Sequence, residues 1–286
     1  MREAATDTVT ETLTIAVWQH ASAPGDVAAN LAALDNAARR AHDAGAALLV
    51  TPEMFLTGYN IGARLAPLAL TQPLERAREI AAHRGIGLVI GGPELAPTTE
   101  ASDAHASDLS APRIFNAAWL VDERGEVLAR HRKIQLFGDL DRSLFVAGDA
   151  PVTVAEFHGF TVAMLVCFDV EFPETVRAAS RAGADLVAVP TAQMEPFSFV
   201  NEHLIRVRAW ENGVYVAYAN HVGVDGDLTY VGRSVIADPL GQHVATAGPT
   251  EPALLLATLD RGTLDRARAQ SPYVAELRGE VFGAPA

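Results

Sequence analysis

The sequence has one cysteine, Cys167, among 286 residues. A single thiol cannot form a disulfide within the chain, so we expect a cytoplasmic protein rather than a disulfide-stabilised secreted one. No apolar run approaches the roughly 18 residues that span a bilayer. The polar segment 1–12 contains none of the apolar stretch that marks a signal peptide. These absences predict a protein with no membrane partner.

Positive charge is also scarce, because 22 Lys and Arg face 35 Asp and Glu, a net charge of −13. Such a chain is poorly suited to bind nucleic acid. The nine histidines include no H-x-x-x-H pair, and one cysteine cannot build a thiolate zinc site. Phosphate-binding P-loops and G-x-S-x-G elbows are missing, and the glycines at 85–87 fit a strand edge better than a dinucleotide fingerprint. We therefore expect no metal and no cofactor.

Hydrophobic residues make up 49% of the chain and charged residues 20%, which is enough for a sizeable core. Apolar strand-like runs alternate with amphipathic helical patterns, which favours an α/β fold. Strands are expected at 13–19, 47–51, 85–91, 115–121, 126–131, 152–157, 161–167, 213–220, 234–237, 243–246 and 254–259, helices at 26–44, 74–84, 174–182 and 199–211, and a polar surface loop at 97–111.

Two segments repeat one pattern, AGAALLVTPE at 44–53 and AGADLVAVPT at 182–191. Each reads as a helix end, a glycine stop, a buried strand and a proline exit. This echo indicates a two-fold-like arrangement in which Glu53 and residues 191–194 occupy equivalent strand ends, where ligands of α/β sheets bind. Helix–glycine–strand joints also converge in many α/β proteins, which is the alternative explanation. No linker separates the halves, so we expect one domain with two sheets.

Three residues are candidates for chemistry because each follows a predicted strand. Glu53 follows the strand at 47–51, Lys133 ends the hairpin strand at 126–131, and Cys167 ends the strand at 161–167. Taken alone, such a Glu is ordinarily solvated, such a Lys is a surface charge, and a lone Cys is a small core residue. The argument depends on the three occurring together.

The blocks around them are Pro-Glu-x-x-x-x-Gly-Tyr at 52–59, Arg-Lys-x-x-Leu-Phe at 132–137 and Cys-Phe-Asp-x-x-Phe-Pro-Glu at 167–174. Together they resemble the nitrilase or carbon–nitrogen hydrolase superfamily, whose Glu–Lys–Cys triad has this order and similar spacing. Asn116, Gly125, Pro190, Thr191 and Asn220 also fall where that family has such residues. The resemblance implies a four-layer αββα sandwich over residues 10–260, a C-terminal helix and tail at 261–286, and a homodimer that extends the sandwich.

The resemblance also implies a mechanism that needs no cofactor. Cys167 would attack an amide carbonyl to give a thioester, Glu53 would move the protons, and Lys133 would hold the oxyanion with the backbone N–H of Phe168. Free thiol and carboxyl pKa values differ by about 4 units, or roughly 6 kcal/mol. We expect burial to raise the pKa of the Glu and the adjacent ammonium to lower that of the thiol.

Many relatives carry a further glutamate in the loop after the lysine, and this chain has none there. Asp141 is the candidate for that role and Asp139 the second choice, although a turn-forming surface aspartate is an equally good reading. The expected substrate pocket contains Tyr59, Phe145, Gln193 and Met194, with Phe197 nearby. Its aromatic and methionine residues could equally be core.

True nitrilases tend to follow the cysteine with Trp-Glu, whereas this chain has Phe168 and Asp169, which favours amides. The function expected is therefore an amidase that converts small carboxamides to carboxylic acid and ammonia. An N-carbamoyl amino-acid hydrolase or an ω-amidase on the same triad is the alternative, with Arg142, Arg177 or His131 binding a substrate carboxylate. A nitrilase ranks lower, as does a catalytically silent scaffold with this fold.

Overall fold

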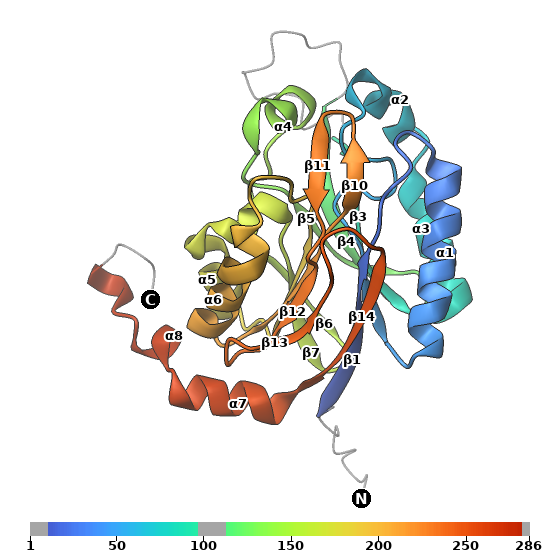
Figure 1. The fold of residues 1–286 in the computed structure, drawn as a ribbon. Helices are drawn as coiled ribbons and strands as arrows, with labels where there is room; N and C mark the ends of the chain where they lie inside the picture. Colours follow the sequence, from blue (N-terminus) through green and yellow to red (C-terminus); the bar gives the residue numbers. More distant parts are fainter. Residues whose placement is uncertain (1–10, 97–112, 282–286) are drawn as a thin grey trace, which may run out of the picture.

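Two six-stranded sheets lie face to face between two layers of helices (Figure 1). The structure is a computed structural model that describes residues 11–96 and 113–281. The surface loop expected at 97–111 lies outside the described residues. The αββα sandwich expected from the sequence is confirmed, since α1 and α3 cover one sheet and α5 and α6 cover the other.

The first sheet has the order β14-β1-β2-β3-β4-β5 and the second the order β13-β12-β9-β8-β7-β6. The strands of the first are β1 (Thr12–Gln19), β2 (Leu48–Val50), β3 (Gly87–Leu95), β4 (Ile114–Val121), β5 (Val127–Arg132) and β14 (Ala253–Asp260). Those of the second are β6 (Thr153–Phe157), β7 (Phe160–Met164), β8 (Leu186–Pro190), β9 (Tyr215–Ala219), β12 (Val235–Ala237) and β13 (His243–Thr246). The hairpin β10 (Val222–Asp225) and β11 (Leu228–Val231) stands apart from both sheets.

Eight α-helices complete the described fold. They are α1 (Val27–Asp43), α2 (Leu65–Ala69), α3 (Pro73–Arg84), α4 (Gly138–Leu144), α5 (Pro173–Arg181), α6 (Ile205–Asn212), α7 (Arg261–Gln270) and α8 (Tyr273–Glu276). Helix α1 begins as the sequence predicts, because the Asp26 side chain accepts a hydrogen bond from the backbone N–H of Ala29. A short π-helical turn (Val200–Leu204) precedes α6.

The sequence echo corresponds to a structural equivalence of β2 and β8. Strand β2 lies between its parallel neighbours β1 and β3, and β8 lies between its parallel neighbours β7 and β9. The two strand exits meet, because the backbone N–H of Glu53 donates to the carbonyl of Thr191 at 3.2 Å. Glu53 and residues 191–194 therefore lie at equivalent strand ends, as the repeated pattern predicts.

The alternation along β1 shows how the layers pack. Ile15 and Val17 contribute to the core between the two sheets, whereas Ala16 and Trp18 pack under α1 and α3. Successive strand residues point to opposite faces, and here both faces are covered, so the strand is apolar at every one of these positions. Full burial of a residue such as Ile15 contributes about 1.5–3 kcal/mol.

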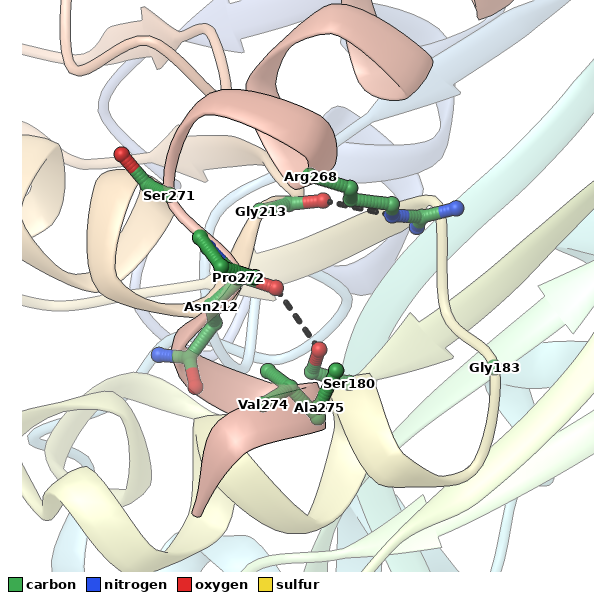
Figure 2. A pocket seen from close by; sticks show the side chains of 9 residues that line it. All are labelled: Ser180, Gly183, Asn212, Gly213, Arg268, Ser271, Pro272, Val274 and Ala275. Carbon is green, nitrogen blue, oxygen red and sulfur yellow. Dashed lines mark hydrogen bonds between the residues drawn. The ribbon is translucent and has the colours of Figure 1, made fainter.

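The C-terminal helices are held against the second helical layer. The Arg268 side chain of α7 donates to the carbonyl oxygens of Gly213 and Ala184 and pairs with Asp185. Figure 2 shows Arg268 directed at Gly213, and Ser180 bonded to the backbone of Asn212, around a cavity of about 310 Å³. The guanidinium thus binds one carbonyl oxygen just after α6, that of Gly213, and one between α5 and β8, that of Ala184. The cavity therefore lies where α7 packs against the second helical layer.

Candidate active site

Glu53, Lys133 and Cys167 converge although they come from distant segments. Glu53 lies just beyond β2, Lys133 directly follows β5, and Cys167 lies just beyond β7. Gly91 of β3 makes room for the first of these segments, since a Cβ atom there would lie 2.7 Å from the carbonyl oxygen of Pro52. The glycine is thus required by the close approach of β3 to the backbone that carries Glu53.

Lys133 is the centre of a fully buried group of charges. Its Nζ lies 2.7 Å from Glu53 Oε1 and 2.6 Å from Asp141 Oδ2, and all three side chains are inaccessible to solvent. Asn116 Nδ2 donates to the same Glu53 oxygen at 2.6 Å. Glu53 Oε2 is buried without a hydrogen-bond partner among the described residues. A buried carboxylate oxygen without a donor is available to a thiol, a substrate N–H or a water molecule.

Asp141 belongs to this group, and its oxygens are already engaged. Tyr59 donates its hydroxyl to Oδ1 at 2.7 Å, while Phe137 donates its backbone N–H to Oδ2 at 2.9 Å. The segment expected to be a loop is instead helix α4, whose first turn contains Asp141. Asp139, the second choice, lies on the surface and pairs with Arg142. Of the two candidates, Asp141 is therefore the one that contacts Lys133, and it lies in a helix where a loop was expected.

Cys167 begins a 3-10 turn (Cys167–Glu171) in an uncommon backbone conformation. Its φ angle is +46°, in the left-handed region that residues with a Cβ rarely adopt. Only 6% of the residue is exposed, and Sγ lies 4.0 Å from Gln193 Oε1. The thiol is therefore nearly enclosed and lies at a strand end, on a backbone conformation that is uncommon for a residue with a side chain.

Burial dominates the electrostatics of the three groups. Burial raises the pKa of Glu53 although Lys133 opposes the shift. Burial together with the carboxylate of Glu53 also raises the pKa of the Cys167 thiol well above its usual range. The thiol expectation was wrong in direction, because desolvation of the thiolate outweighs its attraction to the ammonium. Burial alone would lower the pKa of Lys133, but the carboxylates of Glu53 and Asp141 raise it well above its usual range, so the lysine stays charged.

Asp169 joins the segment that follows Lys133 to the segment that carries Cys167. Its Oδ1 accepts the backbone N–H groups of Ile134 and Gln135 at 3.0 and 2.8 Å. Its Oδ2 accepts the backbone N–H of Val166 at 3.1 Å and lies 3.1 Å from His131 Nε2. From the sequence, Asp169 was part of the cysteine block and a mark of an amidase rather than a nitrilase, and no contact with the segment after Lys133 was predicted for it. Its position next to Phe168 in the cysteine block was the available signal for this fastening role.

His221 supports Glu53 from the other side. Its Nε2 donates to the backbone carbonyl of Glu53 at 2.7 Å, and its ring packs between Phe55 and Tyr230. Burial lowers the pKa of His221 to about 4, so the ring is neutral near pH 7. The sequence analysis missed this residue, because nothing in the local pattern around His221 connects it to Glu53.

The expected pocket residues lie beside the buried charges. Tyr59, Phe145 and Met194 belong to one apolar cluster, and none is more than 8% exposed. Gln193 faces the thiol. Phe168 packs edge-to-face against Phe137, which also contacts the half-exposed ring of Phe197 at 5.8 Å between ring centroids. These side chains give the site apolar walls.

None of the basic residues considered for binding a substrate carboxylate joins the site. Arg142 lies at the surface with Asp139, and His131 is buried against Asp169. Arg177 belongs to α5 and faces Glu211 of α6. Within residues 11–96 and 113–281, no three His, Cys, Asp or Glu side chains are arranged to hold a metal ion. No helix in those ranges is long and apolar enough to cross a membrane.

Comparison with known proteins agrees with this geometry. Residues 14–269 match the family model for carbon-nitrogen hydrolases. A hydrolase in the pqqF 5′ region of Pseudomonas protegens is 41% identical over 276 residues, which cover 95% of this chain and 91% of that protein. An (R)-stereoselective amidase from Pseudomonas sp. is 33% identical over 276 residues, covering 94% and 93%.

Solved structures of similar fold include an amidase and a mutant of it with a ligand bound to its active-site cysteine. The crystal structure of an amidase from Nesterenkonia sp. has a TM-score of 0.81 and 38% identity and covers 96% of both chains. A glutamate-to-glutamine mutant of the Nesterenkonia sp. AN1 amidase (TM-score 0.81, 37% identity) shows covalent addition of the acetamide moiety of fluoroacetamide at its active-site cysteine.

The stacked sheets and the matches to hydrolases and amidases identify the class of protein as a hydrolase. The chain belongs to the carbon–nitrogen hydrolase family, within the nitrilase superfamily, and is a hydrolase that acts on amide bonds.

Proposed function

We propose that this enzyme hydrolyses small neutral carboxamides to a carboxylic acid and ammonia through a thioester on Cys167. The observation that carries the proposal is the buried contact of Glu53 with Lys133 beside the buried thiol of Cys167. The carbon–nitrogen hydrolase family and the covalent acetamide adduct of the Nesterenkonia mutant agree with it.

In this mechanism Glu53 Oε2 accepts the thiol proton as Cys167 attacks the carbonyl carbon. The pKa of the thiol is raised, so proton transfer accompanies attack instead of preceding it. The raised pKa of Glu53 makes it a stronger base than an exposed glutamate. Glu53 then gives that proton to the nitrogen, the carbon–nitrogen bond breaks, and ammonia leaves. Water, deprotonated by Glu53, attacks the thioester and releases the acid.

Lys133 and the backbone N–H of Phe168 stabilise the negative oxygen of each tetrahedral intermediate. Two of the three ammonium N–H groups point at Glu53 and Asp141, so one donor is left for the substrate among the described residues. Asp141, with its oxygens engaged by Tyr59 and Phe137, is a positioning residue that aims this ammonium. One such donor contributes about 3–4 kcal/mol to transition-state stabilisation.

The proposed substrate is neutral because, among the residues that the structure describes, the candidate basic residues leave no cation at the site for a carboxylate. Lys133 is already matched by two carboxylates, and Arg142 and His131 are paired elsewhere. A carbamoyl amino acid or a 2-oxo acid amide would place its own carboxylate against uncompensated negative charge. In this proposal Tyr59, Phe145, Gln193 and Met194 contact the acyl group of the substrate. The packing of Tyr59, Phe145 and Met194 in one apolar cluster supports a small apolar acyl group.

The test measures ammonia from a panel of neutral amides, N-carbamoyl amino acids, ω-amides and nitriles at equal concentration. Neutral amides should be hydrolysed fastest, and denaturing mass spectrometry should detect the acyl group on Cys167. Cys167→Ala should abolish both signals and leave the fold intact, which circular dichroism can check. Strong preference for acids would favour the carbamoylase or ω-amidase alternative. Unchanged activity of Cys167→Ala would refute the mechanism.

We also propose a cytoplasmic homodimer whose subunits associate through the layer of α5 and α6, with residues 10–260 as the catalytic domain. Apolar side chains are exposed there, with Val207 45%, Trp210 40% and Tyr273 44% accessible. The rings of Trp210 and Tyr273 pack together, with 4.9 Å between their centroids, and form one patch across α6 and α8. Light scattering should give twice the chain mass for the wild type. Val207→Asp should convert it to a monomer, and an unchanged dimer would exclude this face.

A further inference from the structure

The side chain of Gln193 is held in one orientation close to the thiol. Its Nε2 donates to the backbone carbonyl of Phe197 and to Glu171 Oε1, both at 3.3 Å. A backbone carbonyl can only accept a hydrogen bond, so the amide nitrogen must face Phe197. The carbonyl oxygen of the side chain therefore points the other way and accepts a hydrogen bond from the Cys167 thiol, with 4.0 Å between the sulfur and the oxygen. This oxygen loses its donor when the thiol gives up its proton.

The backbone of Gln193 is fixed as well. Its N–H donates to Asn220 Oδ1 at 2.8 Å, and its carbonyl accepts Asn220 Nδ2 at 3.1 Å and the N–H of Val231 at 3.0 Å. The residue is 5% exposed. Beside the sulfur the chain thus presents a rigid acceptor that has little access to water. A buried acceptor of this kind favours a ligand that brings a donor.

We propose that Gln193 Oε1 accepts an N–H of the substrate carboxamide, and that Glu171 is the positioning residue that keeps this oxygen turned toward the substrate. The inference rests on the proposed amidase function, and it explains why the enzyme would prefer amides to nitriles and esters. A nitrile has no N–H to offer, and an ester places a second oxygen against the acceptor. Once the thiol proton has passed to Glu53, both would leave Gln193 Oε1 buried without a donor, which disfavours them relative to an amide.

The same contact assists departure of ammonia. With one N–H held by Gln193 and the carbonyl oxygen held by Lys133, the nitrogen cannot rotate freely. Its developing lone pair is directed toward Glu53, which carries the proton it must receive. The hydrogen bond therefore orders the substrate at acylation and plays no part in hydrolysis of the thioester.

The test compares butyramide with p-nitrophenyl butyrate, because both give the same butyryl-enzyme and differ only before it forms. Gln193→Met should lower kcat/KM for butyramide about 10- to 100-fold, the usual effect of losing one buried hydrogen bond. It should leave kcat/KM for the ester unchanged or raise it, because Gln193 Oε1 offers the ester no favourable hydrogen bond. Wild-type enzyme should release no ammonia from butyronitrile.

Glu171 variants test the positioning role. Glu171→Leu removes an acceptor for Gln193 Nε2 and should lower the amide-to-ester ratio of kcat/KM about 3- to 10-fold. Glu171→Gln keeps a carbonyl oxygen at that place and should restore the ratio. Glu174→Gln, on the exposed side of α5, is the matched control and should behave as wild type. A merely structural role for Glu171 would change amide and ester alike.

Equal losses for butyramide and the ester in Gln193→Met and Glu171→Leu would overturn the inference and leave the amidase proposal standing. Wild-type enzyme that releases no ammonia from any amide and forms no acyl adduct would overturn the amidase proposal itself. Thermal unfolding of each variant confirms folding. If Gln193→Met does not fold, the Glu171 pair decides: an unchanged ratio in Glu171→Leu refutes the inference, and a lowered ratio supports it.

Discussion

The buried imidazole of His221 should make the stability of this enzyme depend on pH in a way that one substitution removes. Burial lowers the pKa of His221 from an ordinary 6.5 to about 4. In the unfolded chain the ring takes up a proton below pH 6.5, whereas in the folded enzyme it stays neutral until about pH 4. Between these values the unfolded state binds more protons, so the folded state loses stability as the pH falls.

The size of the effect follows from the two pKa values. Each pH unit across that window costs about 1.4 kcal/mol, so His221 should remove about 3 kcal/mol of unfolding free energy by pH 4. Domains are typically stable by only about 5–15 kcal/mol, so this is a substantial fraction. Other groups also titrate over this range, and the comparison must therefore be made with a variant.

His221→Gln removes the titrating ring and keeps an N–H donor for the backbone carbonyl of Glu53. At pH 7 the variant should be less stable than wild type by about 1–2 kcal/mol, from lost packing against Phe55 and Tyr230. Urea unfolding at pH 7, 6, 5 and 4 should show this gap closing and then reversing as wild type loses its extra 3 kcal/mol or so. His42→Gln, on the exposed face of α1, controls for loss of a solvated imidazole. Parallel wild-type and His221→Gln curves would refute the reasoning.

Four further substitutions probe the site and its supports. Lys133→Met should abolish ammonia release and lower the unfolding free energy by about 3–5 kcal/mol, because Glu53 and Asp141 lose their shared cation; near-normal stability in urea would contradict this. Asp141→Asn removes the negative charge that helps raise the pKa of Glu53, so the acid limb of the kcat/KM profile should move to lower pH, and a limb that stays in place or moves to higher pH would count against the assignment. Gly91→Ala should push the backbone that carries Glu53 and reduce kcat at least about 10-fold, whereas unchanged kcat would mean that the strand end can shift freely. Arg268→Ala should lower the melting temperature while kcat/KM at 25 °C stays at the wild-type value, since its contacts fasten only the C-terminal helices, and lost activity would show that those helices reach the site.

Much of this arrangement could be predicted from sequence because the chemistry follows strand ends. Buried apolar runs located β2 and β7, a hairpin signal located β5, and Glu53, Lys133 and Cys167 lie just beyond the ends of these three strands. The repeated pattern at 44–53 and 182–191 predicted two equivalent strand exits, which meet in the hydrogen bond between Glu53 and Thr191. Asp141 could be chosen from its spacing to Lys133 alone.

The parts that escaped prediction depend on burial and on long-range contacts. The pKa of Cys167 shifts opposite to expectation because sequence shows the neighbouring lysine but not the depth of the thiol. The fastening role of Asp169 and the support from His221 join segments far apart in the chain. The hairpin of β10 and β11 was overlooked despite the turn signal Asp225-Gly226, because its strands are short and belong to neither sheet.

The meeting of the two strand exits has a consequence for how activity returns after denaturation. Glu53 and Lys133 are carried by one sheet, whereas Cys167 and Gln193 follow strands of the other. In the proposed mechanism neither half can form a thioester by itself, however well ordered it becomes. The return of amide hydrolysis during refolding therefore reports when the two sheets dock. The far-ultraviolet circular dichroism signal, which reports secondary structure, should recover earlier than the activity.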